Sequence, residues 1–177
     1  MNYFELYGLP VMMKVEPIGL RKKFYELSRL YHPDFYLDAP EQTRQEMLER
    51  SSDVNRAYKT FQHEDDTIRY VLTMKGLLHE EEKYALGADF LMEVMEINEK
   101  LMELEIDPNP DLLQDVESET RALLIKSHDD VEAIITNYSE DIHSEKELLQ
   151  VKDYYYRKKY LQRILDKIFQ IRNIAAL

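Results

Sequence analysis

Apolar side chains recur with the period of an α-helix along most of the chain. Between residues 17 and 31, Leu20, Phe24, Leu27 and Tyr31 follow the i, i+4, i+7, i+11 spacing that places them on one side of a helix. Regular alternation of apolar and polar residues, the signature of a half-buried strand, is scarce, and only four glycines occur in 177 residues. The pattern therefore predicts an all-α protein.

The same periodicity, together with the positions of proline, glycine and polar runs, divides the chain into helical segments separated by breaks. Residues 17–31, 41–61 and 66–75 are expected to be helical in the first part, with the first two forming an antiparallel hairpin. In the second part, helices are expected over residues 81–106, 111–138 and 144–173, with a possible interruption of the middle one at residues 127–130. Three such helices joined by short loops predict an antiparallel three-helix bundle.

The distribution of charge places a domain boundary near residue 76. Residues 1–76 carry 11 Lys and Arg against 12 Asp and Glu, whereas residues 77–177 carry 12 against 23, so most of the net charge of −12 lies in the second part. Two domains are therefore expected, residues 1–76 and residues 77–177. Because phosphates repel an acidic surface, the second domain is expected to bind basic partners and not nucleic acid.

The helix predicted over residues 17–31 also has a polar face and a sharp end. Its polar side contains a tyrosine and three cations: Arg21, Lys22, Tyr25 and Arg29. The helix is followed by His32, Pro33 and Asp34. Pro33 keeps His32 out of the helical backbone conformation and has no backbone N–H to donate. On these grounds alone, the triplet could be a helix end followed by an ordinary loop.

Taken together with the opening Tyr3–Pro10 segment, this helix and its His-Pro-Asp corner (His32–Asp34) resemble a J-domain. The chain as a whole resembles the HscB family, J-domain co-chaperones dedicated to iron–sulfur cluster biogenesis. The resemblance implies a J-domain helical hairpin followed by the bundle. It also implies that the corner and the basic face bind an HscA- or DnaK-type chaperone ATPase and stimulate it. Phe35 departs from the family, in which a lysine often follows the triplet.

The helix predicted to begin near residue 81 has two apolar sides. Its core stripe contains Phe90, Val94, Ile97, Leu101 and Leu104. A second set, which we call the methionine patch, lies on another side: Leu91, Met92, Met95 and Met102. Glu96, Glu99 and Glu103 border this patch. An apolar patch edged with charge usually marks an interaction site, although a bundle could also bury both sides of the helix.

The resemblance assigns a partner to this surface. In the HscB family the corresponding segment binds the IscU-type iron–sulfur scaffold protein. The family's motif positions fall here on Leu91, Met92, Met95, Glu96, Glu99 and Glu103, and a further aromatic contact falls on Tyr156 of the last helix. Tyr156 is expected to be exposed, because it lies away from the apparent core line of that helix, Leu148, Val151, Tyr155 and Leu165.

Several functions find no support in the sequence. The chain contains no cysteine, glycine-rich phosphate loop or HExxH motif, so we expect no cofactor, no metal site and no enzymatic activity. It shows neither a signal peptide nor an apolar run long enough to span a membrane, so a cytoplasmic protein without a membrane partner is expected.

Two alternatives to the favoured function remain. The chain could be a J-domain co-chaperone for a different client, or a structural helical-bundle protein in which the His-Pro-Asp corner is incidental.

Overall fold

A computed structural model describes residues 1–175, which form eight α-helices and one 3-10 helix without any strand. The all-α prediction is therefore confirmed for this part of the chain. The elements are α1 (Tyr3–Tyr7), α2 (Pro17–Leu30), η1 (Pro33–Tyr36), α3 (Glu41–Phe61), α4 (Glu64–Met74), α5 (Ala88–Ile106), α6 (Pro110–Asp129), α7 (Glu132–Asn137) and α8 (Glu145–Ile174).

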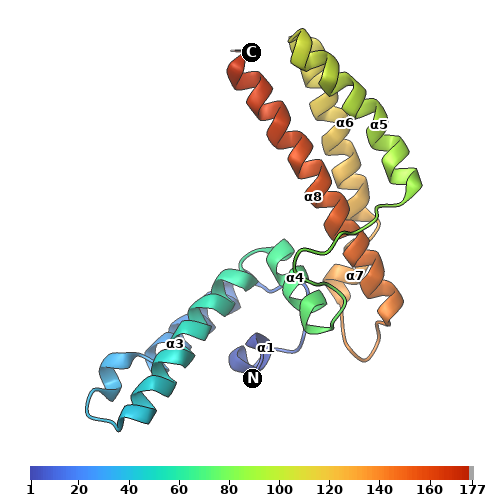
Figure 1. Cartoon of the computed structure of the whole chain (residues 1–177). Coiled ribbons are helices and arrows are strands. Elements are labelled where there is room, and N and C mark those ends of the chain that lie inside the picture. The colour runs from blue at the N-terminus through green and yellow to red at the C-terminus, as the bar shows by residue number, and fades with distance from the viewer. Residues whose placement is uncertain (176–177) are drawn as a thin grey trace. The chain divides into compact units, whose positions relative to one another are not determined.

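The chain divides into two compact units, which are described separately (Figure 1). The first unit contains Met1–Leu78 and Ile134–Ser144, and the second contains His79–Ala133 and the residues from Glu145 onward. The expected boundary at residue 76 lies within two residues of the first division. The segment 134–144, which the sequence pattern assigns to the second domain, belongs to the first unit because it packs there, with Lys75 forming an ion pair with Glu140.

In the first unit, α2 and α3 form the hairpin. Helix α2 begins at Pro17, and the side chain of Glu16 caps it by accepting hydrogen bonds from the backbone N–H groups of Ile18 at 2.7 Å and Gly19 at 2.6 Å. These bonds lower the pKa of the Glu16 carboxyl. Leu20 and Leu27 of α2 are buried as predicted.

The base of the hairpin is held by a cluster of aromatic rings around Phe61, which is 2% exposed. The Phe61 ring lies 4.7 Å from that of Phe4 and 5.6 Å from that of Tyr7. The hydroxyl of Tyr7 donates a buried hydrogen bond of 2.8 Å to the carbonyl of Val54 in α3. The aromatic rings and this hydrogen bond hold α1 against α3 at one end of the hairpin. The loop between α2 and α3 lies at the opposite end.

The second unit is the predicted three-helix bundle, in which α5, α6 and α8 run side by side with α6 antiparallel to the other two (Figure 1). All five members of the predicted core stripe of α5 are buried, together with residues of α6 and α8: Leu113, Val116, Leu123, Leu161, Ile164, Leu165 and Ile168. The predicted interruption of the middle helix is confirmed, because α6 ends at Asp129 and α7 begins at Glu132.

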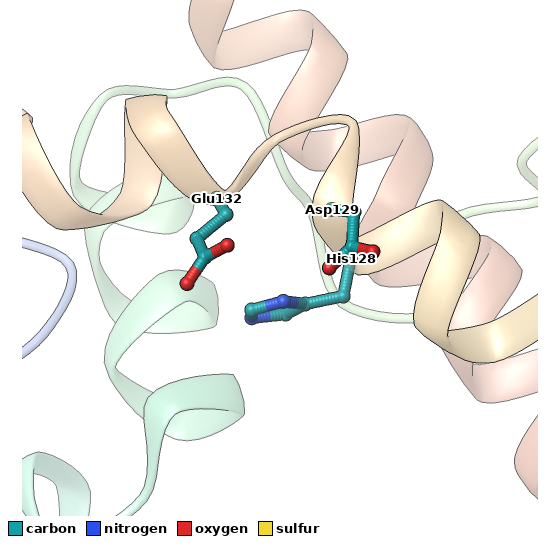
Figure 2. Close-up of side chains that lie close together, drawn as sticks. All are labelled: His128, Asp129 and Glu132. Carbon is teal, nitrogen blue, oxygen red and sulfur yellow. The ribbon is translucent and has the colours of Figure 1, made fainter.

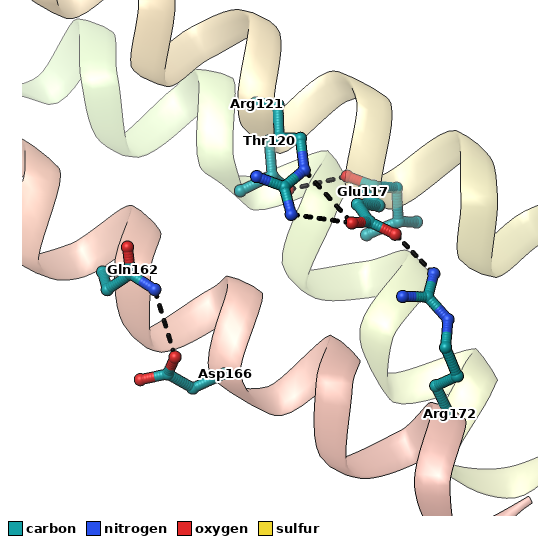
Figure 3. A network of polar contacts seen from close by, with 7 residues as sticks. Glu117, Thr120, Arg121, Gln162, Asp166 and Arg172 are labelled. Carbon is teal, nitrogen blue, oxygen red and sulfur yellow. Dashed lines mark hydrogen bonds and ion pairs between the residues drawn. The ribbon is translucent and has the colours of Figure 1, made fainter.

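A polar cluster also joins α6 to α8 (Figure 3). The carboxylate of Glu117 on α6 forms ion pairs with Arg172 of α8 and with Arg121 one turn along its own helix, the latter at 2.9 Å. The hydrogen bond from Arg172, followed by that from Arg121, lowers the pKa of Glu117. The ion pair therefore adds an electrostatic link to the apolar packing of the two helices.

The prediction of a helix beginning near residue 81 is wrong, because α5 starts only at Ala88. Residues 82–87 are not helical, and Glu81 has a positive φ of 60°. The side chains of Glu82 and Tyr84 instead contact α8. Such tertiary contacts override a modest helical propensity. Within residues 1–175, no helix is both long enough and apolar enough to cross a membrane.

Candidate functional site

The His-Pro-Asp corner lies at the end of α2, as predicted. Helix α2 stops at Leu30, and His32 has the extended backbone conformation, φ −67° and ψ 125°, that a following proline requires. The Nδ1 atom of His32 accepts a hydrogen bond of 3.3 Å from the backbone N–H of Asp34. The side chains of His32 and Asp34 are 51% and 77% exposed, so both polar groups are available to a partner.

The loop after the corner is only partly anchored. The hydroxyl of Tyr36 donates a hydrogen bond of 2.7 Å to the carbonyl of Leu30, which ties η1 to the last turn of α2. Phe35 and Leu37, in contrast, are 74% and 67% exposed. Phe35, which stands where the family often has lysine, thus presents an apolar ring next to the corner, with its centroid 5.8 Å from that of His32.

The basic face of α2 is exposed, as predicted, and three of its cations form no ion pair within the described residues. Arg21, Lys22, Tyr25 and Arg29 are all exposed. Among the described residues, no carboxylate lies within ion-pair distance of these three cations, whereas Lys23 on the same helix lies 3.7 Å from Glu26. The three positive charges are therefore free to attract an acidic partner surface.

The second predicted surface, on α5, is also exposed. The exposed fractions are 44% for Leu91, 69% for Met92, 55% for Met95 and 65% for Met102. Burial of both apolar sides within the bundle, the alternative considered from the sequence, is therefore wrong for these residues. The patch has the composition of a surface that adapts to a partner, because methionine side chains are flexible and polarisable.

The carboxylates beside the methionine patch keep their negative charge uncompensated. Glu96, Glu99 and Glu103 are exposed, and no cation pairs with them in the part of the chain that the structure describes. The nearby Lys100 pairs instead with Glu119 of α6 at 2.6 Å. Beside the patch, a shallow groove of about 580 Å³ runs between α5 and α6, lined by residues that include Met92, Glu96, Glu119 and Ala122.

Tyr156 is less accessible than predicted. It is half-buried, because its ring stacks on that of Tyr84 with centroids 4.5 Å apart, and its hydroxyl donates a hydrogen bond of 3.2 Å to Glu82. Burial, followed by the negative charge of Glu82, raises the pKa of Tyr156 to about 12. The sequence pattern did not predict these neighbours, because it favours a helix over residues 81–87.

Tyr156 nevertheless lies on the side of α8 that faces α5. The hydroxyl of Tyr160, one turn later, accepts a hydrogen bond of 2.8 Å from Asn98 of α5. Helices α5 and α8 run in the same direction (Figure 1). Met95 lies about one turn before Asn98 on α5, and Tyr156 lies about one turn before Tyr160 on α8, so the two residues are at similar heights along the bundle. The hydrogen bond between Asn98 and Tyr160 therefore sets the turn of α8 that contains Tyr156 beside the turn of α5 that contains Met95.

One group of side chains has the donor types of a metal site (Figure 2). His128 and Asp129 from the end of α6 and Glu132 from α7 each offer a ligand atom, and these atoms lie within 4.8 Å of one another. Both carboxylates are exposed, and exposed acidic groups often gather in this way without an ion. The group is assigned no role, and the expectation that the chain needs no metal remains a prediction.

Comparison with known proteins gives matches over nearly the whole chain. Residues 86–168 match the family model of the HSCB C-terminal oligomerisation domain. The Co-chaperone protein HscB homolog of Acinetobacter baylyi is 29% identical over 170 residues, which cover 95% of this chain and 89% of the relative. The homolog from Acinetobacter baumannii strain ATCC 17978 is 26% identical over 168 residues, covering 95% and 88%.

Solved structures agree with these matches. The human co-chaperone protein HscB superimposes with a TM-score of 0.71 and 26% identity, covering 96% of this chain and 81% of the human one. Chaperone HscB from Vibrio cholerae gives a TM-score of 0.67 over 99% of both chains, and at 23% identity this likeness supports the fold. The bundle, the helical hairpin and the matched relatives agree: the chain is similar to HscB proteins over nearly its whole length, and residues 86–168 match the family model of the HSCB C-terminal domain.

Proposed function

We propose that the protein is a cytoplasmic co-chaperone that joins a chaperone ATPase of the HscA or DnaK type to an iron–sulfur scaffold protein of the IscU type. The observation that carries the proposal is the exposure of the His-Pro-Asp corner, with three unpaired cations on the adjacent face of α2. The names of the two Acinetobacter relatives and of the human structure, co-chaperone in each case, support the same assignment.

In the chaperone-binding step, the corner supplies polar groups and α2 supplies charge. Pro33 fixes the turn, so the carboxylate of Asp34 is held outward to accept a charge-assisted hydrogen bond from a basic group of the chaperone. Arg21, Lys22 and Arg29 attract an acidic surface, and Tyr25, 59% exposed, adds an aromatic contact between them. Binding of the corner to the ATP-bound chaperone promotes hydrolysis.

In the scaffold-binding step, the methionine patch supplies apolar area, and Glu96, Glu99 and Glu103 select a basic surface. Tyr156 completes this surface on the α8 side. The two surfaces lie on one chain, so a bound scaffold is delivered to the chaperone at a raised effective concentration. The protein therefore acts by binding and not by catalysing a reaction of its own.

The chaperone-binding role is tested by steady-state ATPase assays of an HscA-type chaperone. The variant Asp34→Asn removes the charge at the corner and is expected to abolish stimulation. Asp38→Asn is the matched control, because Asp38 is also exposed in the same loop and the chemical change is identical. Retention of stimulation by Asp34→Asn would refute the proposed role of the corner.

A further inference from the structure

The segment His79–Gly87, which precedes α5, packs against α8 within the second unit. It begins with a turn in which the backbone N–H of Glu82 bonds to the carbonyl of His79 at 3.3 Å, and Glu81 occupies the left-handed region with φ 60°. A residue other than glycine adopts this conformation only at an energetic cost, which surrounding contacts must offset. Here the contacts come from the next residues, Glu82 and Tyr84.

Glu82 uses both carboxylate oxygens on α8. One oxygen lies 2.7 Å from the ammonium of Lys152, and the other accepts the 3.2 Å hydrogen bond from the hydroxyl of Tyr156. The side chain of Lys152 is only 10% exposed, so its charge requires a nearby anion. These bonds, with that from Lys152 the strongest, lower the pKa of the Glu82 carboxyl. Glu82 is therefore held in place, and it holds the hydroxyl of Tyr156 in turn.

Tyr84 covers one face of the Tyr156 ring. The two rings are nearly parallel, with an angle of 9° between them. The hydroxyl of Tyr84 donates a hydrogen bond of 2.9 Å to Asp153, one turn before Arg157 on α8, and the ammonium of Lys152 lies 5.4 Å from the Tyr84 ring centroid. Tyr156 is thus restrained at its hydroxyl by Glu82 and at its ring face by Tyr84.

We propose that Glu82 and Tyr84 are positioning residues of the scaffold-binding surface, which hold the ring of Tyr156 in the orientation that the scaffold protein meets. The inference rests on the proposed function, since it assumes that Tyr156 contacts the scaffold. A restrained side chain loses less conformational freedom on binding than a mobile one. Releasing Tyr156 is therefore expected to weaken scaffold binding roughly two- to tenfold, without removing any atom of Tyr156.

The test is a double-mutant cycle on the affinity for a purified iron–sulfur scaffold protein, measured by isothermal titration calorimetry. The variants are Tyr84→Ala and Tyr156→Ala, alone and combined. Tyr84→Ala is expected to weaken binding in the parent chain and to have no effect in the Tyr156→Ala chain, because Tyr84 acts through Tyr156. Lys83→Ala is the matched control, an exposed side chain between the two positioning residues, and it is expected to leave the affinity unchanged.

A second variant guards against general loss of structure. Glu82→Gln keeps the shape of the side chain and removes its charge. The expected spectroscopic signature is a lower pKa for Tyr156 than in the parent chain, because the negative charge of Glu82 raises the pKa of that hydroxyl. The titration is followed by carbon-13 NMR of the labelled tyrosine rings and assigned with Tyr156→Phe. A change in this titration shows that Glu82 controls the environment of Tyr156 in a folded chain.

The inference is overturned if Tyr84→Ala leaves the affinity unchanged in the parent, or weakens it equally in the Tyr156→Ala chain. It is also overturned if the Tyr156 titration is the same with Gln at position 82. Failure of the proposed function is a separate result: the parent chain would then fail to bind the scaffold, or would bind it equally well after Met92→Ala and Met95→Ala.

Discussion

Truncating the two methionines at the centre of the exposed surface of α5 should weaken scaffold binding without unfolding the protein. Full burial of a methionine side chain is worth about 1.5–3 kcal/mol. Met92 is 69% exposed and Met95 is 55% exposed, so only these fractions remain to be buried by a partner. Because alanine retains part of that area, Met92→Ala with Met95→Ala should cost about 2 kcal/mol in total, or about 30-fold in Kd.

The assay is calorimetric titration of a purified iron–sulfur scaffold protein into the parent and the double variant. Ile125→Ala is the matched control, since Ile125 is 61% exposed in the same bundle but does not line the groove between α5 and α6. Both variants should change the free energy of unfolding by no more than about 0.5 kcal/mol, as is usual for exposed sites. Equal affinities for the parent and the double variant would show that Met92 and Met95 do not contact the scaffold protein.

Two further predictions concern stability. Phe61→Ala should lower the free energy of unfolding of the first unit by about 3–5 kcal/mol, because it empties the centre of the aromatic cluster, whereas Phe35→Ala, at an exposed ring, should change it by less than about 0.5 kcal/mol. Hydrogen exchange of peptides from α1 and α4 measures both, and similar exchange in the two variants would contradict the packing described. Glu117, whose pKa is lowered from its ordinary value of 4.5 by Arg172 and Arg121, stabilises the bundle above that pH, and the stabilisation is lost as the pH falls below it. Arg172→Ala should therefore lower the urea midpoint at pH 7 and have a smaller effect at pH 3; a difference independent of pH would exclude this ion pair as its cause.

Much of the fold follows from local patterns in the sequence. The spacing of Leu20 and Leu27 predicts the buried side of α2, and Pro33 predicts where that helix must end. The stripe from Phe90 to Leu104 predicts the buried side of α5, and the apolar residues outside this stripe predict its exposed methionines. These features are predictable because helix periodicity and the geometry of proline act within one or two turns.

The contacts of Tyr156 could not be predicted in this way. Glu82 and Tyr84 lie 74 and 72 residues earlier in the chain, and no local pattern distinguishes a segment packed on α8 from the first turns of α5. The positive φ of Glu81 is equally invisible, because glutamate is an ordinary residue for a helix. The one hint in the sequence was Gly87, which stands just before α5 as its N-cap.

The start of α4 shows the same limit at a smaller scale. The sequence pattern predicts that this helix covers residues 66–75. The helix instead starts at Glu64, with His63 at its N-cap and no side-chain hydrogen bond there. The three acidic residues fill the first turn, where they interact favourably with the helix dipole, and the buried hydroxyl of Thr67 bonds to the carbonyl of His63 at 2.9 Å. The sequence pattern therefore predicted the helix but not the residue at which it begins.

The most direct test of the account is the ATPase rate of an HscA-type chaperone, measured with the scaffold protein present and absent. The parent chain should stimulate the chaperone alone and stimulate it further when the scaffold is added. Met92→Ala with Met95→Ala should retain the first effect and lose the second, and Asp34→Asn should lose both. A chain that stimulates equally well with Asn at position 34, or whose scaffold-dependent effect survives loss of both methionines, would contradict the claim that one protein joins chaperone and cargo through these two surfaces.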